Sequence, residues 1–405
     1  MKKKGILYAL IFIGSLFYFF ANFQRIAIPG AVFDLLQHEL NVSAPYITAF
    51  GAIFMYIYAF NQLVIGVLVD RYGGLRIMLT GGIILGLGAL LFPISSNLPL
   101  MYFSRVLVGL GGSTFYLSLI RELKGCFSDK NFGIAISVML CIGYAGGIAA
   151  NAPFVFLMQY INWREILVIL GFVILAGVIL FALLSRHIEF PAINRTVKLR
   201  TLPFRLVLHK KHNRNLCNFG ISYSIQAIIG KKFLEDFCLM PASKAAMVLS
   251  LMAVIAAIFN IINASFCKMC HNHRVIFLKN AAVITFVSLL IICLCLIFEI
   301  RTYFIAVIFF ILAANASLTS LLVPVLHLTN RKMVSGTAVS IMNFCFFTMV
   351  GLLGTAMGFL LNLFEPEKSG NVLVYSNQSY LAVFGLFFLL SVFELYKARK
   401  LSNKY

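Results

Sequence analysis

Acidic residues are scarce in this chain of 405 residues, which has 13 Asp and Glu against 33 Lys and Arg. Charged residues of both signs make up only 11% of the chain, and 61% of its residues are hydrophobic. Soluble domains carry roughly one quarter charged residues. A chain with so few charged residues cannot form a water-exposed surface. A soluble globular protein is therefore excluded, and a membrane protein is expected.

Apolar runs close to the about 20 residues that cross a bilayer recur along the whole chain. The start, "MKKKGILYALIFIG", is followed by no small-x-small cleavage site, so we interpret it as an uncleaved first helix. The pattern predicts an all-α polytopic protein with twelve transmembrane helices. The expected spans lie near 5–28, 46–68, 77–96, 99–120, 132–158, 165–184, 216–237, 244–266, 280–298, 302–327, 334–363 and 379–396.

Lys and Arg concentrate in alternate loops, which fixes an expected orientation because cytoplasmic loops keep basic residues. Both termini are expected in the cytoplasm, in a multi-pass protein of the cell membrane, here the bacterial inner membrane. The net charge of +20 is then mostly a topology signal with attraction to anionic lipids, and it does not indicate nucleic acid. Of the nine cysteines only Cys238 falls near the outer side, so no disulfide is expected.

A basic stretch at 185–215 separates six expected spans from six others. It predicts an N-terminal bundle at 1–184, a cytoplasmic linker at 185–215 and a C-terminal bundle at 216–405. "GIAISVM" at Gly133 matches "GTAVSIM" at Gly336, as an internal repeat of two six-span halves requires. The alternative is that apolar helices resemble one another by chance.

The loop after the second expected span reads "GVLVDRYGGLR", with Gly66, Asp70, Arg71, Gly73 and Arg76. Gly66 permits close helix approach, Asp70 can pair with basic groups, and the glycine pair allows a sharp turn. This stretch resembles the loop signature of the major facilitator superfamily. The resemblance implies a conformational gating role for these residues; the alternative is an ordinary cytoplasmic loop.

Two further stretches carry the same resemblance. "RVLVGLGG" in the fourth span, from Arg105 to Gly112, is similar to the family's Arg-x-x-x-Gly-x-Gly pattern, and "NWR" at 162–164 resembles the usual entry to span six. The resemblance covers nearly the whole chain and is stronger in its first half. It implies a carrier that works by alternating access, without enzymatic activity or cofactor, and we expect a monomer in the lipid bilayer.

The stretch "FCKMCHNHR" from Phe266 has the Cys-x-x-Cys-His spacing that attaches a c-type haem. Cys267, Cys270, His271 and His273 could also hold a metal ion tetrahedrally. Shifted by 198 residues, however, "GVLVDRYGGLR" falls on "ASFCKMCHNHR", which favours a decayed second copy of the loop signature. Haem attachment takes place on the outer side of the membrane, whereas this loop is expected inside, and we expect no resident metal.

Four basic residues fall within expected spans, where ionisable groups are costly and mark functional sites. They are Arg25, Arg105, Lys231 and Lys232. In the functional interpretation they line a cavity and bind an anion, with Asn22 on the same helix face as Arg25. In the structural one, Arg25 snorkels, Arg105 holds helices together, and the lysines form i,i+4 pairs with Glu235 and Asp236.

Uncharged polar residues within spans form a weaker set of candidate substrate ligands, and hydrogen bonding between helices explains them as well. The candidates are Gln226, Asn315 and Asn343. The acids within expected spans, Glu235 and Asp236 among them, lie near span ends, so no mid-span carboxylate indicates a coupling site. The stretch "GYAGGIAANAP" lacks the Gly-Pro pair of drug/proton exchangers in the family, which favours uptake or facilitated exchange over efflux.

These patterns predict a secondary active or facilitative transporter of a small anionic solute, an organic acid or a carboxylate metal chelate. A drug/proton antiporter is the alternative within the class. From another class, a membrane-embedded redox or metal protein using Cys267, Cys270 and His271 stays open, as does a sensor that does not transport.

Overall fold

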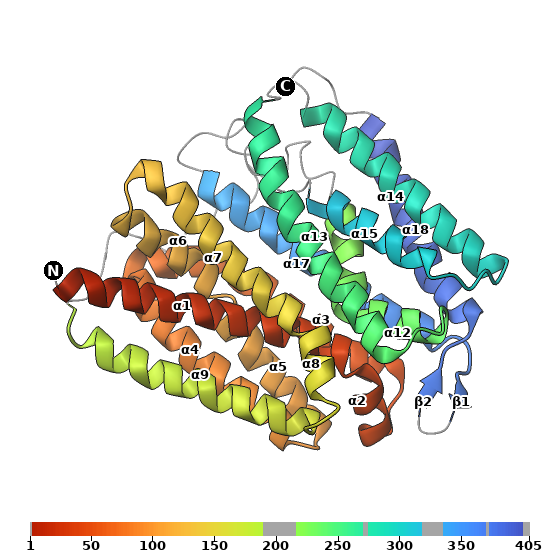
Figure 1. Cartoon of the computed structure of the whole chain (residues 1–405), viewed down its shortest axis with the longest axis horizontal. Helices are drawn as coiled ribbons and strands as arrows, with labels where there is room; N and C mark the ends of the chain where they lie inside the picture. The colour runs from red at the N-terminus through yellow and green to blue at the C-terminus, as the bar shows by residue number, and fades with distance from the viewer. Residues whose placement is uncertain (1, 189–215, 270–273, 318–334, 370–371, 400–405) are drawn as a thin grey trace. The chain divides into compact units, whose positions relative to one another are not determined.

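The computed structural model describes residues 2–188, 216–269, 274–317, 335–369 and 372–399. These residues are almost entirely helical, with one short hairpin (Figure 1). By its internal contacts the chain groups into two compact units, and each is described by itself. The first unit comprises Met1–Arg25 and Ile53–Pro203, and the second comprises Ile26–Ala52 and Phe204–Tyr405. The boundaries drawn from the sequence at 184 and 216 stay a prediction.

In the first unit, α4 is the central helix, because α5, α6 and α9 all pack against it (Figure 1). Its buried face carries Leu85, Ala89 and Phe92, which explains why an apolar helix without charged pairs is stable there. The helices are α1 (Lys2–Ile26), α3 (Ala44–Tyr72, of which Ile53 onward belongs here), α4 (Gly74–Ile94), α5 (Leu98–Gly112), α6 (Phe115–Cys126), α7 (Asp129–Ala149), α8 (Ala152–Leu157) and α9 (Trp163–Ser185).

In the second unit, α14 packs against α18, α11 against α17, and α13 against α15. An antiparallel hairpin precedes α18 and places Lys368 opposite Leu373. The elements are η1 (Ala27–Ala31), α2 (Phe33–Leu40), α11 (Leu216–Ser224), η2 (Ile225–Ile229), α12 (Gly230–Asp236), α13 (Ala242–Met269), α14 (Arg274–Ile297), α15 (Phe304–Ala316), α17 (Ser335–Leu361), β1 (Glu367–Ser369), β2 (Val372–Val374) and α18 (Asn377–Arg399).

Ten of the described helices are long and apolar enough to cross a membrane, and they match ten of the twelve expected spans. The seventh expected span, 216–237, is divided into α11, η2 and α12. The tenth, 302–327, contains the shorter apolar helix α15 and then runs outside the described residues. The sequence predicted the seventh span without its interruption, because an apolar run does not report a local change of helix type.

Two interruptions of π-helical type, η1 and η2, pack against each other in the second unit. Ile28 leaves the helical region at φ −119° and ψ 118°, because Pro29 disfavours helical geometry in the residue before it. At Gly30 a Cβ would lie 2.8 Å from the carbonyl oxygen of Ala227. The two backbones therefore approach more closely than any other residue at position 30 would allow.

Candidate functional site

Arg25 and Asn22 form a contact pair in the last turns of α1, on the shared face that the sequence predicted. The Nη2 group of Arg25 donates a hydrogen bond to Oδ1 of Asn22. The Nδ2 group of Asn22 donates in turn to the carbonyl oxygen of Tyr18, at 2.8 Å. The Arg25 guanidinium lies 5.7 Å from the ring centroid of Tyr58. The Asn22 amide on the same helix and the Tyr58 ring on α3 thus contact the cation.

This pair has the chemistry of an anion ligand. A guanidinium presents five N–H donors in a planar fork that matches a carboxylate, and the contact with Asn22 orients this fork. Asn22 is buried and Arg25 is half-buried. Such a group is more strongly attractive to an anion than an exposed arginine, because the surrounding dielectric constant is lower.

Arg105 is also in the first unit, but its contacts differ from those of Arg25. It is fully buried, and its Nη1 donates to the carbonyl oxygen of Gln24 at 3.0 Å. Its guanidinium lies 5.0 Å from the ring centroid of Phe54. The contacts fit the structural interpretation: Arg105 fixes the backbone of α1 one residue before Arg25, so it positions that residue.

Lys231 and Lys232 make the ion pairs that the sequence predicted. Nζ of Lys231 lies 2.9 Å from Oε1 of Glu235. Nζ of Lys232, whose side chain is only 1% exposed, lies 2.8 Å from Oδ1 of Asp236. A buried ammonium is stable only with such partners.

Lys232 has a second partner that the sequence did not reveal. Oδ1 of Asp34, in α2, lies 2.8 Å from the same Nζ. Oδ2 of Asp236 accepts hydrogen bonds from the hydroxyl of Tyr380, at 2.7 Å, and from the backbone N–H of Tyr375, at 3.0 Å. We call Asp34, Lys232, Asp236, Tyr375 and Tyr380 the ion cluster. It joins α2, α12 and the start of α18 within the second unit.

Within the ion cluster, Tyr375 lies outside the membrane-spanning segments. Burial raises the pKa of Tyr375 to about 12, although the hydrogen bond from Gln37 and the charge of Lys232 oppose this. The phenol therefore stays neutral at physiological pH. It accepts a hydrogen bond from Nε2 of Gln37 at 2.5 Å, which ties α2 to the segment between β2 and α18. Asp34 and Gln37 stand in "VFDLLQHEL", where only the polar positions of a short amphipathic helix could have indicated them.

The uncharged candidates lie on separate helices of the second unit. Asn315, in α15, is buried, and its Nδ2 donates to the carbonyl oxygen of Ala281 and to Oγ1 of Thr285, both at 2.8 Å. These bonds link α15 to α14, as the structural interpretation expects. Gln226 is half-buried in η2, and Asn343 is half-buried in α17. Their part in binding stays a prediction.

The turn between α3 and α4 carries the loop motif, and Gly73 makes it possible. Gly73 adopts φ 89° and ψ 149°, a conformation that side chains disfavour, and its N–H donates to Val69 O at 2.9 Å. Nη1 of Arg121, in α6, lies 3.6 Å from Oδ1 of Asp70 and also donates to the carbonyl oxygen of Val69. The end of α6 thus holds the end of α3.

The sequence missed one member of this arrangement. Oε1 of Glu122 accepts a hydrogen bond from the N–H of Gly74 at 2.8 Å, at the first residue of α4. A carboxylate at a helix N-terminus is favourable, so Glu122 stabilises the turn. The position of Glu122 beside Arg121 gave no signal, because only the fold brings α6 to the turn.

The remaining motif residues have local contacts. The guanidinium of Arg71 lies 5.4 Å from the ring centroid of Tyr72. Nη1 of Arg76 donates to the carbonyl oxygen of Tyr72 at 3.2 Å. Gly66 is half-buried within α3. The gating role of the motif stays a prediction.

Cys270, His271 and His273 lie outside the described residues, as does the side chain of Cys267. Among the residues that the structure does describe, no group of three His, Cys, Asp or Glu could hold a metal ion. The metal interpretation of this loop is therefore untested.

Comparisons with known proteins agree on one family. The sequence model of the Major Facilitator Superfamily matches residues 11–355. The chain is 22% identical over 167 residues to the "Probable sulfoacetate transporter SauU" of Cupriavidus necator, a match that covers 41% of this chain and 39% of that protein. It is 31% identical over 145 residues to the "3-(3-hydroxy-phenyl)propionate transporter" of Escherichia coli, covering 36% and 35%. Each match thus spans well under half of the relative.

Two solved structures share the fold over almost the full length. Both are of a bacterial homolog to the human lysosomal transporter Spinster, in inward-facing conformations. The unoccupied form has a TM-score of 0.71 at 15% identity, and the occupied form 0.68 at 16%; each match covers 97% of both chains. At such identity the likeness shows the fold alone. The predicted fold class and the predicted family are confirmed.

Proposed function

Because this chain belongs to the major facilitator superfamily, we propose that it is a transporter that moves a small organic anion across the membrane by alternating access. The observation that carries the anionic substrate is the Arg25 guanidinium, held by Asn22 beside Tyr58 within a membrane-spanning helix. A cation kept at that depth is costly unless an anion or a hydrated cavity receives it. Arg25 binds the carboxylate, Asn22 orients Arg25, and Arg105 positions the backbone.

The relatives support a carboxylate. The names of both, a sulfoacetate transporter and a 3-(3-hydroxy-phenyl)propionate transporter, specify small carboxylate anions. An organic acid therefore suits the site better than a sugar, and a carboxylate metal chelate has the same charged group. In the second unit, Gln226, Lys231, Asn315 and Asn343 are proposed as further substrate ligands.

The proposed setting is the bacterial inner membrane, with both termini in the cytoplasm and with uptake as the direction of transport. The basic residues of the α3–α4 turn and of the ends of α6 and α18 support this orientation. The turn and the end of α6 then act together as a latch that opens and closes during the cycle.

A drug/proton antiporter is the second candidate, and one observation favours it. The carboxylates of Asp34 and Asp236 both lie 2.8 Å from Nζ of Lys232 in the second unit. The sequence pattern did not indicate Asp34 as a candidate. Buried carboxylates are the groups through which transporters commonly exchange protons.

The test is uptake by vesicles that contain the purified protein, with matched pairs of a carboxylic acid and its neutral amide. The proposal expects uptake of 3-phenylpropionate, or of another acid in the panel, without uptake of the corresponding amide. Equal transport of acid and amide, or export of neutral and cationic drugs against a proton gradient, would favour the antiporter instead.

A further inference from the structure

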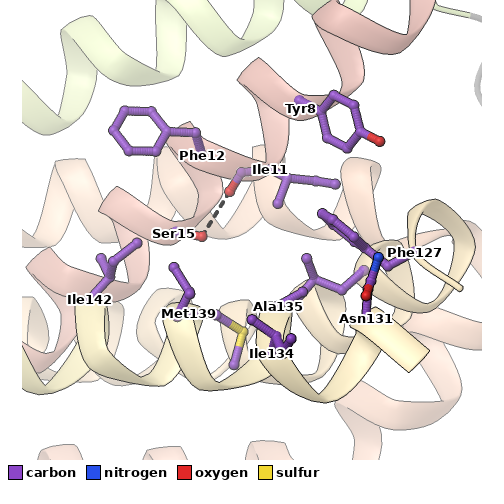
Figure 2. A pocket seen from close by; sticks show the side chains of 12 residues that line it. Tyr8, Ile11, Phe12, Ser15, Phe127, Asn131, Ile134, Ala135, Met139 and Ile142 are labelled. Carbon is purple, nitrogen blue, oxygen red and sulfur yellow. Dashed lines mark hydrogen bonds between the residues drawn. The ribbon is translucent and has the colours of Figure 1, made fainter. Parts of the chain in front are cut away.

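A pocket of about 440 Å³ lies between α1 and α7 in the first unit. Figure 2 shows side chains of both helices around one elongated space. The volume falls within the roughly 300–1,000 Å³ of small-molecule sites. Its lining includes Tyr8, Phe12, Ser15, Phe127, Asn131 and Ile134.

The middle of the pocket is apolar. The hydroxyl of Ser15 donates to the carbonyl oxygen of Ile11 at 2.9 Å, so it is engaged within its own helix (Figure 2). Phe12 is 58% exposed and Ile134 is 65% exposed, so the walls include large apolar side chains that nothing covers in the isolated chain. Water bound there would find few hydrogen-bond partners, and a hydrocarbon fits better.

One end of the pocket has a different chemistry. Figure 2 shows Tyr8, Phe127 and Asn131 together at that end, whereas Ile142 lies at the other. The rings of Tyr8 and Phe127 are 5.7 Å apart. Lys4 is exposed one helical turn before Tyr8, and Lys124 is exposed immediately after Leu123, which also lines the pocket. Along the pocket, apolar side chains are thus followed by aromatic and amide side chains and then by two lysines.

We infer that this pocket binds one anionic glycerophospholipid, with an acyl chain between α1 and α7 and the phosphate near Lys4 and Lys124. Tyr and basic residues at the end of an apolar span match the lipid headgroup region. Both helices contribute to segments that are long and apolar enough to cross a membrane. From Tyr8 to Ser15 the helix rises by about 10 Å, so the acyl chain lies along the helices.

The test is native mass spectrometry of the purified full chain titrated with phosphatidylglycerol or phosphatidylcholine. Wild type is expected to retain one phosphatidylglycerol. Ala135→Phe, which fills the pocket, should lower that affinity at least about tenfold, a change of roughly 1.4 kcal/mol. Ala176→Phe makes the same substitution on an exposed face of α9 and should retain the wild-type affinity.

A surface variant keeps the inference open to refutation even if Ala135→Phe does not fold. Lys4→Gln with Lys124→Gln should weaken phosphatidylglycerol binding about fivefold per lysine and leave phosphatidylcholine binding unchanged. Equal binding of the two lipids to wild type, equal losses in Ala135→Phe and Ala176→Phe, or displacement of the lipid by a transported carboxylate would overturn the inference. Displacement would assign the pocket to the substrate.

Discussion

The half-buried Arg25 and the buried Lys232 make different polar contacts. Lys232 lies between two carboxylates, at 2.8 Å from each, and a tyrosine hydroxyl and a backbone N–H satisfy the far oxygen of Asp236. Arg25 contacts an amide and an aromatic ring. The first arrangement neutralises its charge within the protein. The second arrangement orients a guanidinium fork, whose paired N–H donors match a carboxylate.

Lys232→Met tests the structural half of this contrast. The substitution leaves the Asp34 and Asp236 carboxylates together without their shared ammonium, and breaking a buried ion pair from one side costs about 3–5 kcal/mol. We expect a clear fall in the thermal unfolding temperature of the purified protein. Lys244→Met, at an exposed lysine, should change stability by less than about 0.5 kcal/mol. Equal unfolding temperatures for the two variants would show that the ion cluster contributes little.

At the scale of elements, contacts from α6 secure the turn between α3 and α4. Glu122 binds the first N–H of α4, while Arg121 binds the end of α3 and approaches Asp70. The Asp70 side chain is 71% exposed, so its ion pair alone contributes little stability. The hydrogen bonds from Glu122 and Arg121 to the backbone are the stronger part of the latch, because a hydrogen bond to a charged group contributes about 1.5–3 kcal/mol.

Glu122→Leu removes the acceptor of the Gly74 N–H, and a hydrogen bond to a charged group contributes about 1.5–3 kcal/mol. We expect the maximal rate of vesicle uptake to fall at least about tenfold, with a smaller reduction for Asp70→Asn. The apparent substrate constant should change little, because the turn does not bind substrate.

Glu165→Leu, at an exposed glutamate of α9, is the matched control. The latch would be contradicted if Asp70→Asn or Glu122→Leu raised the apparent substrate constant while the maximal rate of uptake stayed unchanged.

The sequence predicted the apolar helices well, because twenty apolar residues in a row have few alternatives in a bilayer. It also placed Asn22 and Arg25 on one face and paired Lys231 with Glu235, since both depend only on helical spacing. It could not place Asp34 beside Lys232 or Glu122 beside Gly74. Each of those contacts joins residues that are far apart in the chain, so only the packing of helices decides them.

At the scale of the whole molecule, we propose from the sequence that the chain has two repeated halves and that the loop motif has decayed in the second. The first half keeps Asp70 and Arg71, whereas the corresponding stretch near 267–274 has Lys268 and two cysteines instead. The second half need not have a latch of its own, because the α3–α4 turn of the first half already links two helices.

Joint replacement of Cys267 and Cys270 by Ser, and of His271 and His273 by Asn, tests whether that stretch is only a decayed repeat. Uptake should stay within about twofold of wild type, because no substrate or latch role is assigned to these side chains. Elemental analysis of both proteins provides the second readout. Bound zinc or iron in wild type that disappears from the variant together with transport would establish a metal site instead.

Arg25→Lys tests most directly whether Arg25 binds the substrate anion. A lysine keeps the charge but lacks the planar fork that binds a carboxylate through two hydrogen bonds. The cost of placing a cation in the span, about 2.5–3.5 kcal/mol, is similar for both residues, so the variant should insert normally. Arg301→Lys, at an exposed position, is the matched control.

The measurement is the concentration dependence of carboxylate uptake by vesicles at matched protein levels. We expect Arg25→Lys to raise the apparent substrate constant at least about tenfold, equivalent to roughly 1.4 kcal/mol, and Arg301→Lys to leave it unchanged. Unchanged uptake in both Arg25→Lys and Arg25→Gln would show that Arg25 does not bind the anion, and would contradict the account.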